Sequence, residues 1–163
     1  MTLLLAREAV MNRFRSSLNL FNLTEQQWRV LRALNAVDEI EVTELAAATS
    51  LLPPSLSRIL RDLEARHLLR RQSDPQDLRR SLISISPEGL TLIAAVAPYS
   101  EEIYSEVEAA FGRENMETLQ ALLKELTGTL NRLPPKRYGD DELSGDLAAI
   151  IGPARRGRPR GEG

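Results

Sequence analysis

The chain has 163 residues, of which 42% are hydrophobic and 27% charged, a composition typical of one soluble globular domain with or without an extension. It has no cysteine and a single histidine, His67, which excludes disulfides, thiol chemistry and zinc sites built from cysteines or several histidines. No apolar run is long enough to span a membrane, so we expect a cytoplasmic protein that uses no cofactor, metal or membrane partner.

The net charge of −2 is distributed unevenly along the chain. Between residues 52 and 81, seven arginines outnumber four carboxylates, whereas between 101 and 126 seven glutamates outnumber two basic residues. A locally basic segment inside an acidic protein directs the search for nucleic-acid contacts to residues 52 to 81.

Two helices are predicted before residue 40. Residues 3 to 18 place Leu3, Val10, Phe14 and Leu18 close to one stripe at helical spacing. Thr24 to Gln27 form a T-x-x-Q capping box, which predicts a helix from about 24 to 37 with Val30, Leu31 and Leu34 facing inward.

A short helix, a turn and an amphipathic helix follow. Residues 39 to 42 alternate like a short strand, and TELAAATS predicts a compact helix. The next helix, about 52 to 67, has Pro53 and Pro54 in its first turn. Its inward apolar stripe is Leu56, Ile59, Leu60 and Leu63, which leaves a polar face for other contacts.

A hairpin and two more helices complete the pattern. Residues 68 to 73 and 81 to 86 alternate around the polar loop DPQDLRR. Ser86 and Pro87 then start a helix that we expect to reach about residue 111. After Gly112 comes an a/d heptad row that ends at Pro134: Met116, Leu119, Leu123, Leu126, Leu130 and Leu133.

This order of helix, helix and basic hairpin predicts a mainly α protein with a small β-wing, a winged helix-turn-helix that binds double-stranded DNA. We expect major-groove contacts from Pro54, Ser55, Ser57, Arg58 and Arg61. We expect Arg71 to contact phosphate, and Asp77, Arg79 and Arg80 to serve the wing in the minor groove. The alternative for each arginine alone is a solvated surface with local ion pairs.

The stretch from ELAAATS to SISPEG resembles the core of the MarR family of bacterial regulators, whose wing carries D-x-R and then a helix-opening glycine, here Asp77, Arg79 and Gly89. Within that family, AREAVMNRFR with NLTEQQWRVLRAL resembles the regulators of homoprotocatechuate degradation. The resemblance covers roughly residues 3 to 133. One departure is the helix entry at Leu52 to Pro54, which lacks a polar cap and leaves the preference for the first contacted bases open.

The resemblance implies a homodimer on an inverted-repeat operator, not an enzyme, acting as a repressor of an aromatic catabolic operon that a small phenolic or aromatic acid releases. Arg15 and Trp28 are the residues that we expect to bind the effector. The alternatives are that Arg15 is an ordinary surface residue and that Trp28 is an ordinary core residue. Rival functions are a winged-helix protein-interaction module and a ligand-independent activator.

We therefore expect four segments: 1–23, an N-terminal dimerisation helix; 24–86, the DNA-binding domain; 87–133, dimerisation helices; and 134–163, a mobile basic tail. The expected dimer contacts are Leu3, Val10, Phe14, Met116, Leu119, Leu123, Leu126 and Leu130, with packing inside one chain as the alternative. RRGRPRG in the tail resembles an AT-hook, although we favour a disordered solubilising tail as its interpretation.

Overall fold

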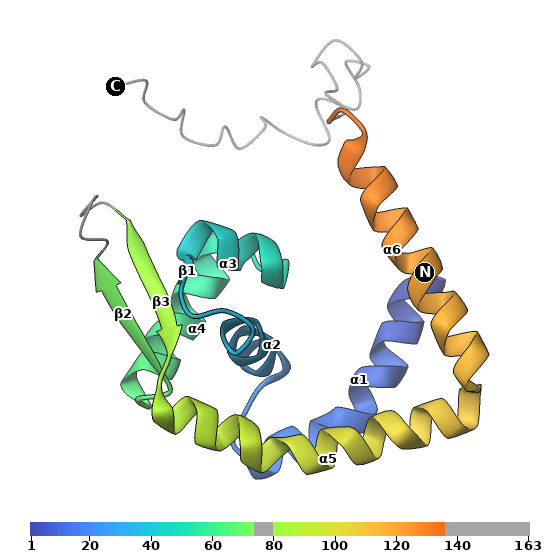
Figure 1. Cartoon of the computed structure of the whole chain (residues 1–163), viewed down its shortest axis with the longest axis horizontal. Coiled ribbons are helices and arrows are strands. Elements are labelled where there is room, and N and C mark those ends of the chain that lie inside the picture. The colour runs from blue at the N-terminus through green and yellow to red at the C-terminus, as the bar shows by residue number, and fades with distance from the viewer. Residues whose placement is uncertain (74–79, 136–163) are drawn as a thin grey trace, which may run out of the picture. The chain divides into compact units, whose positions relative to one another are not determined.

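The computed structural model describes residues 1–73 and 80–135. It divides the chain into two compact units, Met1–Met116 and Glu117–Gly163. In chain order the elements are α1 (Thr2–Leu20), α2 (Glu25–Leu34), β1 (Ile40–Glu41), α3 (Val42–Thr49), α4 (Pro53–Ala65), β2 (Leu69–Ser73), β3 (Ser81–Ile85), α5 (Pro87–Phe111) and α6 (Arg113–Arg132) (Figure 1). This confirms the mainly α winged helix-turn-helix expected from the sequence.

The core of the first unit lies where α2, α3 and α4 meet the sheet, and Figure 1 shows these helices gathered beside the strands. The inward faces predicted for α2 and α4 are confirmed, because Val30, Leu31, Leu34, Leu56, Leu60 and Leu63 are all fully buried and Ile59 is 8% exposed. Burial of one complete apolar stripe on each helix fixes which face of α4 is left for solvent.

Three helices end in the same way, with a non-glycine residue in the left-handed conformation. Asn22, Ser50 and His67 have φ angles of 51°, 52° and 58° after α1, α3 and α4. In each case the following leucine donates its N–H five residues back: Leu23 to Leu18, Leu51 to Ala46 and Leu68 to Leu63. These are Schellman caps, whose leucines turn the chain sharply back onto the core. His67 is exposed, so it serves as a cap residue rather than as core packing.

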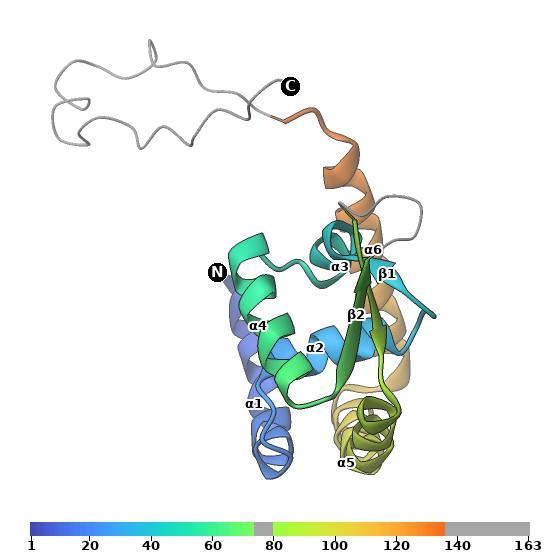
Figure 2. The same ribbon diagram turned by 90° about the vertical axis from the view of Figure 1, so that its left-hand side faces the viewer.

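The sheet is antiparallel in the order β1-β3-β2, with Ile40 opposite Ile83, and Leu69 opposite Ile85 through to Ser73 opposite Ser81. Leu69 and Ile83 are buried, whereas Arg70 to Ser73 are exposed. The outer part of the β2–β3 hairpin therefore projects from the core as a wing, and Figure 2 shows the two strands extending side by side beyond α2.

The apolar residues expected at a dimer surface divide into two groups. Leu3 and Val10 are 60% and 40% exposed on α1, but Phe14 is only 4% exposed and packs in the core of its own chain. On α6 no residue is buried, and Leu119, Leu126 and Leu130, with Leu133 just after the helix, are each more than 40% exposed. An apolar heptad row exposed on a described helix is surface that another protein chain can cover.

Candidate functional site

The part of α4 left outside the core carries every residue expected at the major groove, with Pro54, Arg58 and Arg61 opposite the buried stripe and Ser55 and Ser57 on its two flanks. Pro54, Ser55, Ser57, Arg58 and Arg61 are all exposed. The helix starts with prolines in its first turn and no side-chain cap at Leu52, as expected. Ser55 and Arg58 also line a polar cavity of about 390 Å³ together with Asp62. The structure thus brings two hydroxyls and two guanidinium groups onto one helical face that fits a groove about 12 Å wide.

Two side chains, Gln27 and Arg66, form the hydrogen bonds that hold α4 against the chain that precedes it. The Gln27 side chain caps α2, where its Oε1 accepts from the Thr24 N–H at 2.7 Å, and its Nε2 also donates to Asp62 Oδ2 at 2.5 Å. Arg66 donates to the carbonyl of Asn22 at 2.9 Å and to that of Phe21 at 3.4 Å. The capping box predicted from the sequence is confirmed, and the same glutamine anchors α4.

The described part of the wing carries three exposed arginines, Arg70, Arg71 and Arg80, and two of them form ion pairs. Arg71 lies on β2 with its Nε 4.0 Å from Glu64 Oε2, and Arg80 Nη1 lies 2.9 Å from Glu41 Oε1 of β1. Both side chains are at least one-third exposed, so these pairs are surface pairs that a phosphate can replace at low cost. Asp77 and Arg79 lie outside the described residues, as do Arg155, Arg156, Arg158 and Arg160 of the tail.

Trp28 lines a cavity of about 250 Å³ between α1, α2 and α5. The other lining residues are Val10, Met11, Phe14, Glu25, Arg29, Arg32 and Tyr104. Arg32 Nη1 donates to the Tyr104 hydroxyl at 2.9 Å, and the Tyr104 ring lies 5.1 Å from the Phe14 ring. The aromatic side chains can pack against a ring, and the guanidinium and the phenol can bind an anionic group. Pockets for drug-sized ligands start at about 300 Å³, so a cavity of about 250 Å³ suits a small anion with a single ring.

Arg15 does not share that cavity. Its Nη2 lies 2.5 Å from Glu8 Oε2, and it also donates to Asn12, so the side chain is drawn back along α1. The hydrogen bond from Arg15 holds the pKa of Glu8 below its ordinary value. Arg15 lines a separate cavity near the α1–α2 turn. The two residues expected to bind one effector therefore lie at different cavities.

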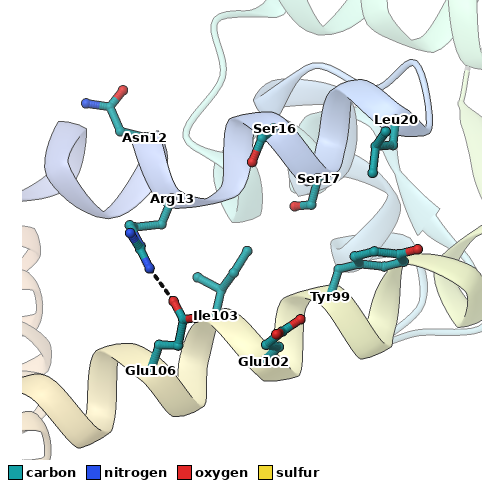
Figure 3. A pocket seen from close by; sticks show the side chains of 9 residues that line it. All are labelled: Asn12, Arg13, Ser16, Ser17, Leu20, Tyr99, Glu102, Ile103 and Glu106. Atoms are coloured by element: carbon teal, nitrogen blue, oxygen red, sulfur yellow. Dashed lines mark hydrogen bonds and ion pairs between the residues drawn. The ribbon is translucent and has the colours of Figure 1, made fainter.

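A larger cavity, about 490 Å³, lies between α1 and α5 and is the one drawn in Figure 3. Arg13 from α1 points at Glu106 of α5 and forms an ion pair with it, while Glu102 lines the same space. With its one cation already paired and a second carboxylate present, this cavity repels an organic anion. The cavity at Trp28, with Arg29 and Arg32 against Glu25, attracts one.

Sequence reasoning missed Arg32 and Tyr104. Arg32 had a usable signal, because it lies four residues after Trp28 and so shares its helical face. Tyr104 had none, because it comes from α5, 72 residues further along the chain. Within residues 1–73 and 80–135, no helix is long and apolar enough to cross a membrane, and no three metal-binding side chains gather.

Residues 21–80 match the model of the MarR family. The chain is 38% identical over 140 residues to the homoprotocatechuate degradative operon repressor of Escherichia coli, covering 86% of this chain and 95% of that protein.

Among solved structures, it is similar to NadR in complex with 4-hydroxyphenylacetate, with a TM-score of 0.74, 35% identity, and coverage of 82% of this chain and 97% of that one. It is also similar to the transcriptional repressor CouR bound to a 23-mer DNA duplex, with a TM-score of 0.72, 25% identity, and coverage of 77% and 89%.

Proposed function

Because the chain belongs to the MarR family, we propose that it is a cytoplasmic homodimeric repressor that binds an inverted-repeat operator and is released by a small phenolic or aromatic acid. The observation that carries the DNA-binding part is the exposed surface of α4, where Arg58 and Arg61 lie opposite the buried stripe and Ser55 and Ser57 lie exposed on its flanks. A single such helix reads few base pairs, so two copies are needed for a specific site.

The exposed leucines of α6 and of α1 supply the apolar surface for that second copy. A regulator with a net charge of −2 needs two basic faces, correctly spaced, to overcome repulsion between its acidic residues and the phosphates. Dimer formation is thus part of the proposed DNA binding.

The cavity at Trp28 supports the effector part of the proposal. A ring can lie between Trp28 and the Phe14–Tyr104 pair, while Arg32 and Arg29 stand where a carboxylate needs a cation. The relatives extend the argument, since one is named for homoprotocatechuate degradation and another was solved with 4-hydroxyphenylacetate. We therefore expect a hydroxyphenylacetate or a compound of the same class.

The DNA part is tested with Arg58→Ala and a charge-matched control, Arg13→Ala, which removes a guanidinium paired with Glu106 on α5. On a duplex selected from random sequences, Arg58→Ala should weaken binding by roughly 5- to 150-fold, the equivalent of about 1–3 kcal/mol for a base contact. Arg13→Ala should bind nearly as the parent does. Equal losses in the two variants contradict the assigned role of α4.

The effector part is tested by thermal shift with 4-hydroxyphenylacetate and its neutral amide. The acid should stabilise the parent protein and the amide should do so far less, because the cavity carries uncompensated positive charge. Arg32→Ala should remove most of the difference between acid and amide. A shift of equal size in the variant places the ligand elsewhere.

A further inference from the structure

Glu25, the first residue of α2, lines the Trp28 cavity and is shared by two arginines. Its Oε1 accepts from Arg29 Nη2 at 2.7 Å, and it also forms an ion pair with Arg7 of α1. Only 13% of the Glu25 side chain is exposed. Arg7 is also paired with Glu8 at 2.6 Å, so within the cavity lining Glu25 is the one carboxylate beside Arg29 and Arg32. That leaves one uncompensated positive charge for a second anion.

Arg29 uses its other nitrogen on a different element. Its Nη1 donates to the backbone carbonyl of Thr49 at 3.1 Å. Thr49 is the last residue of α3 and is 1% exposed, and its hydroxyl donates to the Leu45 carbonyl at 2.6 Å. The last carbonyls of a helix have no partner within the helix, so a guanidinium there makes a favourable charged hydrogen bond.

The contacted carbonyl lies directly before the turn of the helix-turn-helix. Ser50 reverses the chain with φ of 52°, Leu51 N–H returns to the Ala46 carbonyl at 3.1 Å, and α4 starts at Pro53. The Arg29 guanidinium thus joins the carboxylate at the cavity to the turn that aims the recognition helix.

We propose that Arg29 is the positioning residue that couples occupancy of the Trp28 cavity to the orientation of α4. This rests on the effector function proposed above. The carboxylate of an aromatic acid repels Glu25 and competes for the Arg29 guanidinium. When Arg29 turns to the ligand, the Thr49 carbonyl loses its donor and the α3–α4 turn is released, which weakens operator binding.

The surroundings of Arg29 favour this exchange. Burial, and then the charge of Arg7, lower the pKa of Arg29, although an arginine stays protonated at neutral pH. Burial and the neighbouring Arg7 raise the free energy of the charged Arg29 side chain, and a second anion nearby lowers it again. Because coupling is reciprocal, the operator should weaken ligand binding by the same factor.

The test is the ratio of operator dissociation constants with and without saturating 4-hydroxyphenylacetate, by fluorescence anisotropy on the full chain. Coupling free energies in proteins correspond to about 5- to 150-fold, and we expect the parent protein to lie in that range. Arg29→Lys keeps the charge but loses the fork that spans Glu25 and Thr49. Its ratio should fall close to one, and its ligand-free affinity should resemble that of the ligand-bound parent.

Arg13→Lys is the matched control and should keep the full ratio. A full ratio in Arg29→Lys overturns the coupling role while leaving the effector proposal intact. A ratio of one in the parent protein overturns the effector proposal and this inference with it.

Hydrogen exchange of the parent protein gives a second readout that needs no variant. The Leu51 amide should exchange faster when ligand is bound, because the turn that protects it is released. Unchanged or slower exchange across residues 49 to 53, in a protein that the ligand does release from DNA, contradicts the proposed route.

Discussion

Gly89 is the position where a single added methyl group should do most harm for its size. It is the third residue of α5, buried, and its N–H donates to Ser86 Oγ at 2.9 Å. A Cβ built there would lie 2.2 Å from the Leu68 carbonyl oxygen and 2.8 Å from Ile85 Cγ1. Carbon atoms pack well only at about 3.5–4 Å, so the backbone at Leu68 must move by roughly 1 Å.

Two effects of opposite sign decide the magnitude for Gly89→Ala. Overpacking costs about 1–3 kcal/mol and strain on the Ser86 cap about 1 kcal/mol, while the better helix propensity of alanine returns at most about 1 kcal/mol. We expect a net loss of about 1–3 kcal/mol in the free energy of unfolding. Urea unfolding followed by circular dichroism, at one fixed protein concentration, measures it.

Gly128→Ala is the control, since the nearest atom to its added methyl group is Arg132 Nη1, at 3.7 Å. That change should raise stability by up to about 1 kcal/mol through helix propensity alone. If Gly89→Ala is as stable as the parent, the close approach of Leu68 to α5 is not as described. Leu68 directly precedes β2, so the position of the wing would then need revision.

Three further changes have expected outcomes. Thr24→Ala should lower the free energy of unfolding by about 1 kcal/mol, because α2 loses its capping hydroxyl, and Thr24→Ser should restore most of it in the same urea assay. Leu60→Ala should cost about 2–5 kcal/mol at a fully buried site, against under about 0.5 kcal/mol for Leu90→Ala, which is 46% exposed. Glu41→Gln should strengthen operator binding at low salt by releasing Arg80 and removing a negative charge, with the gain shrinking at high salt. Weaker binding by Glu41→Gln at low salt contradicts the idea that Glu41 competes with DNA phosphates for Arg80.

Hydrophobic periodicity and local capping patterns were enough to predict most of the helices and strands. The capping box at Thr24, the prolines that open α4, and the serine and proline that start α5 are each local patterns, and each stands where it was expected. The left-handed turns at Ser50 and His67 were not expected, because neither residue is glycine, the residue that usually takes this conformation after a helix.

The ligand cavity shows where sequence reasoning stops. Trp28 was a candidate because of its type, and Arg32 could have been added from helical spacing, but Tyr104 reaches the cavity only through the packing of α5 on α1. Arg15 was of the right type, yet Glu8 and Asn12 on its own helix hold it elsewhere. Glu8 and Asn12 lie seven and three residues before Arg15, so this competition, unlike the approach of Tyr104, could have been predicted from helical spacing.

The central claim is that two copies of α4 read an inverted repeat, and selection from a random duplex library tests it most directly. The full chain should enrich a two-fold symmetric sequence with half-site centres about 10 base pairs, or a multiple of that, apart. Binding to the enriched duplex should fall steeply with salt, as expected when arginines replace counterions. Enrichment of no sequence, or of an unrepeated site bound by one copy, would contradict the account.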